Sequence, residues 1–138
     1  MKKPNFLAVF LLFLLPGVAA ASQLPLVDPA PITVPANLSQ ADTVKAIKQG
    51  LDYRKWIVGL EQPGLVRATV SASGGVQATV DVSYDAQKIQ IKYVSSQNLD
   101  EKDAADGQRT IASRYINWSR NLVLSITQAL LQQPLGGK

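Results

Sequence analysis

The sequence predicts a small α+β domain, and two periodic patterns carry this prediction. Apolar residues recur every three or four positions from Gln108 to Leu131, which is the spacing of one face of a long helix. Three runs between Val66 and Tyr93 alternate apolar and polar residues, which is typical of strands with one buried face. We therefore expect a two-layer α-β-β-β-α sandwich, with a three- to four-stranded antiparallel meander, a short helix and a long C-terminal helix.

The first 21 residues have the features of a secretory signal peptide. Two lysines precede an apolar run over residues 6–15, and a Pro-Gly pair and three alanines follow it. A membrane-spanning helix needs about 20 apolar residues, so cleavage is favoured over an uncleaved anchor. We expect residues 1–21 to be removed and the protein to be periplasmic, with no transmembrane segment. The chain has no cysteine, which excludes a lipid anchor on cysteine and disulfides.

The next segment, residues 22–38, contains four prolines and few charges. This composition favours extended chain, and we expect a semi-rigid linker. An arm that docks on a partner is the alternative. Residues 39–133 are assigned to a single folded domain, and residues 134–138 to a flexible tail.

The residues from Ser39 to Asp42 resemble a capping box, which predicts that a helix begins there. Its buried face would contain Val44, Ile47 and Leu51. The helix is expected to end near Asp52 or Tyr53.

Four runs are expected to be strands: 56–60, 66–72, 76–84 and 88–93. The short links between the last three suit antiparallel hairpins. The Pro63-Gly64 pair leaves two alternatives for the first runs. Trp56–Leu60 and Leu65–Ser71 form either one bent strand or two strands separated by a turn.

The segment Ser95–Gly107 is expected to be a loop, and it carries four carboxylates within seven residues. Asp103 or Asp106 is placed to cap the long helix. The spacing does not match a calcium-binding loop, because Lys102 stands where an oxygen ligand is needed. No metal site is predicted.

Catalysis is not expected, and no cofactor is implied. The chain has neither histidine nor cysteine, which removes the common general base near neutral pH and the thiolate nucleophile. Nucleophile-elbow, phosphate-loop and dinucleotide-binding motifs are also absent.

Four aromatic residues and one amide are the candidate binding residues: Trp56, Tyr93, Tyr115, Trp118 and Asn121. They could line a ligand groove, and at helical and strand spacing they could equally belong to the core. Asn117 and Asn121 lie one turn apart on the predicted long helix, beside this aromatic row.

A Y-x-x-W-x-x-N-L motif spans Tyr115–Leu122, and the part of the chain before it carries Trp56, Pro63-Gly64, Ala68, Val80, Tyr84, Tyr93, Ser96, Asn98 and Leu99. Over Trp56–Ile126 this pattern resembles small exported bacterial proteins, many of them lipoproteins of uncharacterised function. The chain departs from them at Ile116, where they carry asparagine, and in lacking the lipidated cysteine. The resemblance implies the fold and the compartment, and it implies no activity.

The expected function is that of an exported, non-enzymatic binding or accessory module for another envelope protein or for itself. The alternative is an inhibitor or immunity protein that acts on an envelope hydrolase through the loop Ser95–Gly107. Nucleic acid is not an expected partner. A nucleic-acid-binding surface usually shows concentrated positive charge. The formal net charge of this chain is only +4, the basic residues are scattered along the sequence, and two of them lie in the predicted signal peptide.

Overall fold

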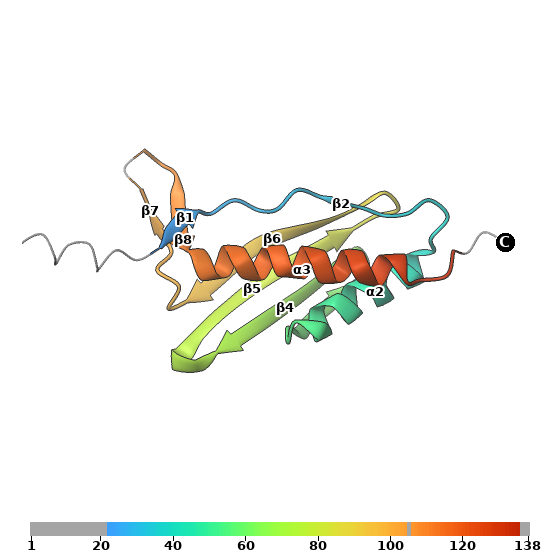
Figure 1. The fold of residues 1–138 in the computed structure, drawn as a ribbon, viewed down its shortest axis with the longest axis horizontal. Coiled ribbons are helices and arrows are strands. Elements are labelled where there is room, and N and C mark those ends of the chain that lie inside the picture. The colour runs from blue at the N-terminus through green and yellow to red at the C-terminus, as the bar shows by residue number, and fades with distance from the viewer. Residues whose placement is uncertain (1–21, 105, 136–138) are drawn as a thin grey trace, which may run out of the picture.

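Two antiparallel sheets and two helices form the structure, a computed structural model that describes residues 22–104 and 106–135 (Figure 1). The predicted signal peptide and the last three residues of the predicted tail lie outside the described residues. The elements are β1 (Gln23–Pro25), β2 (Ile32–Thr33), α2 (Gln40–Tyr53), β3 (Ile57–Gln62), β4 (Leu65–Ala72), η1 (Ser73–Gly75), β5 (Val76–Tyr84), β6 (Lys88–Gln97), β7 (Lys102–Asp103), β8 (Arg109–Ala112) and α3 (Ser113–Leu131). The α+β class with antiparallel sheets and a C-terminal helix is confirmed. None of the helices in the described ranges is long and apolar enough to cross a membrane.

The larger sheet has five strands in the order β2-β6-β5-β4-β3. Consecutive hairpins join its last four strands. Each central strand alternates buried and less buried residues, so one face of the sheet is covered. Pro63 and Gly64 form a turn between two antiparallel strands, which decides between the two alternatives left by the sequence. Gly64 has φ of 82°, a conformation that glycine adopts without a steric penalty.

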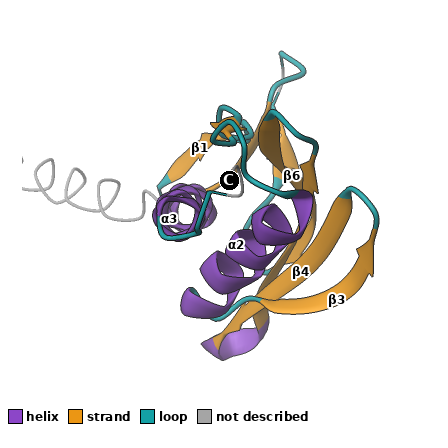
Figure 2. Cartoon of the chain, turned by 90° about the vertical axis from the view of Figure 1, so that its right-hand side faces the viewer, coloured by secondary structure: helices purple, strands orange, loops and turns teal. Residues whose placement is uncertain are grey.

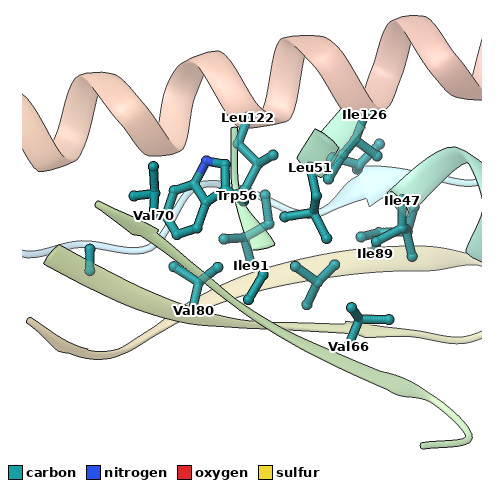
Figure 3. Close-up of a cluster of buried hydrophobic side chains, with 14 of the residues drawn as sticks. Ile47, Leu51, Trp56, Val66, Val70, Val80, Ile89, Ile91, Leu122 and Ile126 are labelled. Carbon is teal, nitrogen blue, oxygen red and sulfur yellow. The ribbon is translucent and has the colours of Figure 1, made fainter. Parts of the chain in front are cut away.

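Helix α2 begins and ends where the sequence predicts. The Ser39 hydroxyl accepts a hydrogen bond from the Asp42 N–H at 3.0 Å, which satisfies one of the free donors of the first turn. The apolar side of α2 faces the sheet, and Ile47 and Leu51 are fully buried there (Figure 3). Val44, which was also expected on this face, is only half-buried and lines a surface groove.

Gly50 of α2 lies against α3 and has a clear packing role. A Cβ atom at this position would lie 2.6 Å from Ile126 Cγ1 and 2.8 Å from the Cα of the same residue. The two helices therefore approach each other closely at this point, beside one another on the same face of the sheet (Figures 1 and 2).

The long helix is shorter than predicted. It begins at Ser113 rather than at Gln108, because Arg109–Ala112 form β8 between β1 and β7 in a second sheet. The expected cap is also wrong. Ala112 occupies the N-cap position without a side-chain hydrogen bond, and the Asp106 carboxylate accepts from the Gln108 N–H at 3.0 Å instead.

The proline-rich segment packs on the domain instead of forming the semi-rigid linker expected over residues 22–38. Its two ends pair with β8 and β6 as β1 and β2, and it runs alongside α3 (Figure 1). Ile32 and Val34 are buried, and the Asp28 carboxylate accepts a hydrogen bond from the Tyr93 N–H at 2.9 Å. Short edge strands tolerate nearby prolines, because an edge has backbone groups that need no partner strand.

Parts of the expected loop Ser95–Gly107 are strand. β6 continues to Gln97, and β7 pairs with β8 in a hairpin that projects from the body (Figure 1). Within it Arg109 forms a hydrogen-bonded ion pair with Glu101 and a second contact with Asp103 at 3.6 Å. The hydrogen bond to Glu101 raises the pKa of Arg109 above its usual value.

Candidate functional site

A pocket of about 330 Å³ lies next to the C-terminal end of α2, between the end of β4 and the first half of α3. Helix α2 has 14 residues and α3 has 19, and α3, β4 and β5 extend past the C-terminal end of α2 (Figure 1). Three segments line the space: the link from α2 to β3, the end of β4 and the first half of α3. We call it the Trp pocket, lined by Arg54, Lys55, Trp56, Val70, Ser71, Ala72, Arg114, Trp118 and Asn121.

The link from α2 to β3 is shaped by a Schellman motif, in which the last turn of a helix is closed by two backbone hydrogen bonds. The Trp56 N–H donates to the Leu51 carbonyl at 2.9 Å, and the Lys55 N–H donates to the Asp52 carbonyl at 3.0 Å. Lys55 has φ of 70°, at the position where glycine is usual. The motif turns the Trp56 side chain inward, next to Val70 and beneath α3 (Figure 3).

The α3 wall is one helical face. Arg114, Trp118 and Asn121 are spaced by four and three residues, which places them above one another on the helix. Trp118 and Asn121 are half-buried, while Arg114 is exposed. The Arg114 guanidinium lies 5.1 Å from the centre of the Trp118 ring, within the range of a cation–π contact.

Positive charge dominates the Trp pocket. Its lining includes three cationic side chains and no carboxylate. Over the described residues, the ion pairs within 4 Å involve Lys48, Arg67 and Arg109, and none involves Arg54, Lys55 or Arg114. Arg54 Nε donates a hydrogen bond to the Ser125 hydroxyl at 2.6 Å, and its guanidinium lies 5.3 Å from the centre of the Tyr53 ring. Arg54 therefore lies on the border between the Trp pocket and the groove between α2 and α3, and it has no carboxylate within 4 Å. A cleft with one sign of charge attracts ligands of the opposite sign.

The structure divides the five predicted binding residues into two groups. Trp56, Trp118 and Asn121 lie together in the Trp pocket. Tyr93 and Tyr115 do not line it. They form an edge-to-face pair elsewhere, with ring centres 5.4 Å apart and an interplanar angle of 84°.

Tyr115 belongs to the core. Its side chain is 1% exposed, and its hydroxyl has no hydrogen-bond partner in the part of the chain that the structure describes. Burial, followed by the nearby Asp28 and Tyr93, raises the pKa of Tyr115 well above 10. Tyr93 is half-buried, and its hydroxyl bonds that of Ser96 at 2.7 Å.

The basic residues and Ser71 were missed by sequence reasoning. The i, i+4, i+7 spacing of Arg114 with Trp118 and Asn121 was readable in the sequence and could have identified one of them. Arg54 and Lys55 gave no such signal, because their position depends on where α2 ends. The edge at Ser71 depends on the relative lengths of β3 and β4.

Four other grooves of about 390–650 Å³ are larger than the Trp pocket, and none of the four brings three cationic residues together. The two largest have the fewest charged lining residues. One of about 530 Å³ lies between α2 and α3, and its only charged lining residue is Arg54. The other, of about 650 Å³, lies between the proline-rich segment and α3, and Arg120 is its only charged lining residue. The Trp pocket brings together three cations and both tryptophans of the chain in a smaller space.

Within residues 22–104 and 106–135, no group of three or more acidic side chains is placed to hold a metal ion. The chain matches no family model, no curated protein and no solved structure. The resemblance to small exported bacterial proteins therefore stays a prediction, and the site must be judged from its own geometry.

Proposed function

We propose that the protein is an exported, non-enzymatic binding module whose Trp pocket recognises an anionic group on an envelope ligand. The observation that carries this proposal is one pocket lined by both tryptophans and by three cationic residues that have no carboxylate within 4 Å. Arginine and lysine supply charge-assisted hydrogen bonds to carboxylate or phosphate oxygens. The half-buried Trp118 ring supplies apolar contact surface next to them, and Trp56, which is 4% exposed, lies behind it in the core.

Two of these cations are unfavourable for the local structure, which supports a role in binding. Lys55 occupies a left-handed backbone conformation in which a side chain costs energy. Arg114 lies in the first turn of α3, where the helix dipole disfavours a cation and where no acidic residue is present. Fold stability alone would favour glycine at the first position and a neutral or acidic residue at the second.

The proposal is tested by titration of the protein with tetraglutamate and, in parallel, with tetralysine. Trp56 and Trp118 are the only tryptophans in the sequence, so intrinsic tryptophan fluorescence comes only from two residues that line this pocket. We expect saturable binding of tetraglutamate and none of tetralysine. Arg114→Gln should weaken binding by about tenfold or more, since a hydrogen bond to a charged group contributes roughly 1.5–3 kcal/mol.

Lys45→Gln is the matched control, because it removes the same charge from an exposed position on α2 outside the Trp pocket. It should bind tetraglutamate as the unmodified protein does. Equal weakening by both substitutions would show that only the net charge matters, and would overturn the assignment of the site.

The inhibitor alternative draws on one observation, the projection of the β7–β8 hairpin from the body (Figure 1). A projecting hairpin suits insertion into the cleft of an enzyme. Replacement of residues 100–107 by a short Gly-Ser turn should abolish protection of cells against an envelope hydrolase under this alternative. Under the proposed function the same variant still binds tetraglutamate.

A further inference from the structure

One wall of the Trp pocket is a strand edge that has no partner. β4 runs to Ala72, but the β3 residue nearest to this end, Ile57, lies opposite Thr69. Residues 70–72 of β4 therefore pair with β5 on one side and, among the described residues, with no strand on the other. Both Ser71 and Ala72 line the Trp pocket.

The direction of the backbone groups follows from the ladder between β4 and β5. The Tyr84 N–H donates to the Gly64 carbonyl at 3.0 Å, so residue 64 directs its backbone toward β5. The pairing of β4 with β5 has no register shift, and backbone groups alternate in direction along a strand. Residues 66, 68, 70 and 72 thus point toward β5, whereas Ser71 directs its N–H and carbonyl toward the open edge.

The open edge is closed at one end by the chain itself. Where β3 would continue beside Ser71, the chain instead turns at Lys55 and Trp56 to leave α2. Residues 70–72 span about 10 Å at roughly 3.3 Å per residue, which is room for about three residues of an added strand. An added segment meets Arg54 and Lys55 at the closed end, so a chain terminus fits there better than a continuous strand.

We propose that the Trp pocket binds the C-terminal tail of a partner protein as a short added strand. In this arrangement, the tail exchanges backbone hydrogen bonds with Ser71, and its terminal carboxylate lies against Arg54, Lys55 and Arg114. An apolar side chain near its end packs on the exposed part of Trp118. The inference rests on the proposed function and specifies its ligand as an extended peptide with a free carboxylate.

The test uses a synthetic tetrapeptide, acetyl-Val-Thr-Val-Glu, with tryptophan fluorescence as the readout. The free acid should bind, and the same peptide with an amidated C-terminus should bind about tenfold more weakly, since it loses a charge-assisted contact. Methylation of the two central backbone nitrogens, one at a time, should weaken binding about tenfold in at least one of the two peptides. That modification removes a backbone donor and keeps every charge.

Two variants of Ser71 distinguish the contribution of its backbone N–H to peptide binding from that of its side chain. Ser71→Ala keeps the backbone N–H, so it should bind the free acid about tenfold more tightly than Ser71→Pro does. Ser71→Pro removes the N–H at an edge where proline is tolerated, and should weaken binding about tenfold. Thermal unfolding of both variants shows whether they remain folded, and the methylated peptides test the same bond in the unmodified protein.

The possible failures are distinguishable. Equal binding of methylated and unmethylated peptides would overturn strand addition, while binding of tetraglutamate would still support the anionic pocket. Equal binding of acid and amide would overturn the terminal carboxylate as the recognised group. Failure of every carboxylate probe would overturn the proposed function together with this inference.

Discussion

Replacement of Gly50 by alanine tests the packing of the two helices. A Cβ atom there would lie 2.6 Å from Ile126 Cγ1 and 2.8 Å from both the Cα and the N of Ile126. A rotamer change relieves only the first of these contacts, since the other two involve the backbone of α3. The helices must therefore move apart, which disturbs the packing of Ile47 and Leu51, two fully buried residues of α2.

The expected cost follows from two opposing effects. Overpacking of a core costs about 1–3 kcal/mol, and two contacts to backbone place this case at the upper end. Alanine returns about 1 kcal/mol, because glycine is a poor helix former. We expect a net loss of about 2 kcal/mol in the free energy of unfolding, or a fall in Tm of roughly 6–12 °C for a domain of this size.

Urea unfolding followed by circular dichroism measures this cost. Gly59→Ala is the matched control, because its Cβ meets nothing within 4 Å, and we expect a change below about 0.5 kcal/mol. A Gly50→Ala variant as stable as the unmodified protein, or more stable, would refute the close approach of α2 and α3.

Three further predictions concern single side chains. Lys55→Gly removes the strain of a left-handed side-chain residue, which is roughly 1–2 kcal/mol, but the greater freedom of glycine in the unfolded chain offsets about 0.4–1 kcal/mol of this gain. The free energy of unfolding in urea should therefore rise by about 0.5–1 kcal/mol while the affinity for tetraglutamate falls. A lower free energy of unfolding would contradict the strain at Lys55. Tyr115→Phe removes a buried hydroxyl that has no partner in the described chain, so it should leave the stability unchanged or raise it by about 1 kcal/mol. Tyr93→Phe loses the hydrogen bond to Ser96 and should cost about 0.5–1.5 kcal/mol. A lower Tm for Tyr115→Phe than for Tyr93→Phe would contradict these hydrogen-bond assignments. Hydrogen bonds from the backbone N–H groups of residues 87 and 88 lower the pKa of Asp85 below its usual value, so the carboxylate stabilises the fold above its unfolded pKa, and this contribution disappears as the pH falls through its folded pKa. The difference in stability between the unmodified protein and Asp85→Asn should be present near about pH 7 and disappear at strongly acidic pH. A difference that does not change with pH would contradict the role of these hydrogen bonds.

The strands of the meander and the first helix were predictable because their patterns are long. Alternation over eight or more residues places Val66 and Val80 on the buried face whatever the rest of the chain does. The cap at Ser39 is likewise a local signal, since its hydroxyl bonds a residue three positions away.

The second sheet was not predictable from pattern. Its strands β1 and β7 have three and two residues, too few to show a period, and they exist through pairing with β8. The same holds for β2, a two-residue edge strand of the larger sheet that pairs with β6. β8 was absorbed into the predicted helix because Ile111 lies in register with the apolar face of α3. Tertiary pairing overrides helical periodicity at that point.

The candidate site was predictable only in its two tryptophans and Asn121. Trp56 and Trp118 stood out by type, but their type does not reveal that they share a pocket and that Tyr93 and Tyr115 do not. The charges depend on where α2 stops, and the free edge at Ser71 depends on the register of β3. Both are properties of the assembled fold.

Titration of the ¹⁵N-labelled protein with acetyl-Val-Thr-Val-Glu, followed by amide correlation spectra, tests the central claim most directly. Both indole N–H signals report on the Trp pocket, since the sequence has no other tryptophan. We predict saturable shifts of these two signals and of the Lys55 and Ser71 amides, with the β7–β8 hairpin unaffected. Unchanged indole signals, or shifts confined to the hairpin, would contradict the Trp pocket as the binding site.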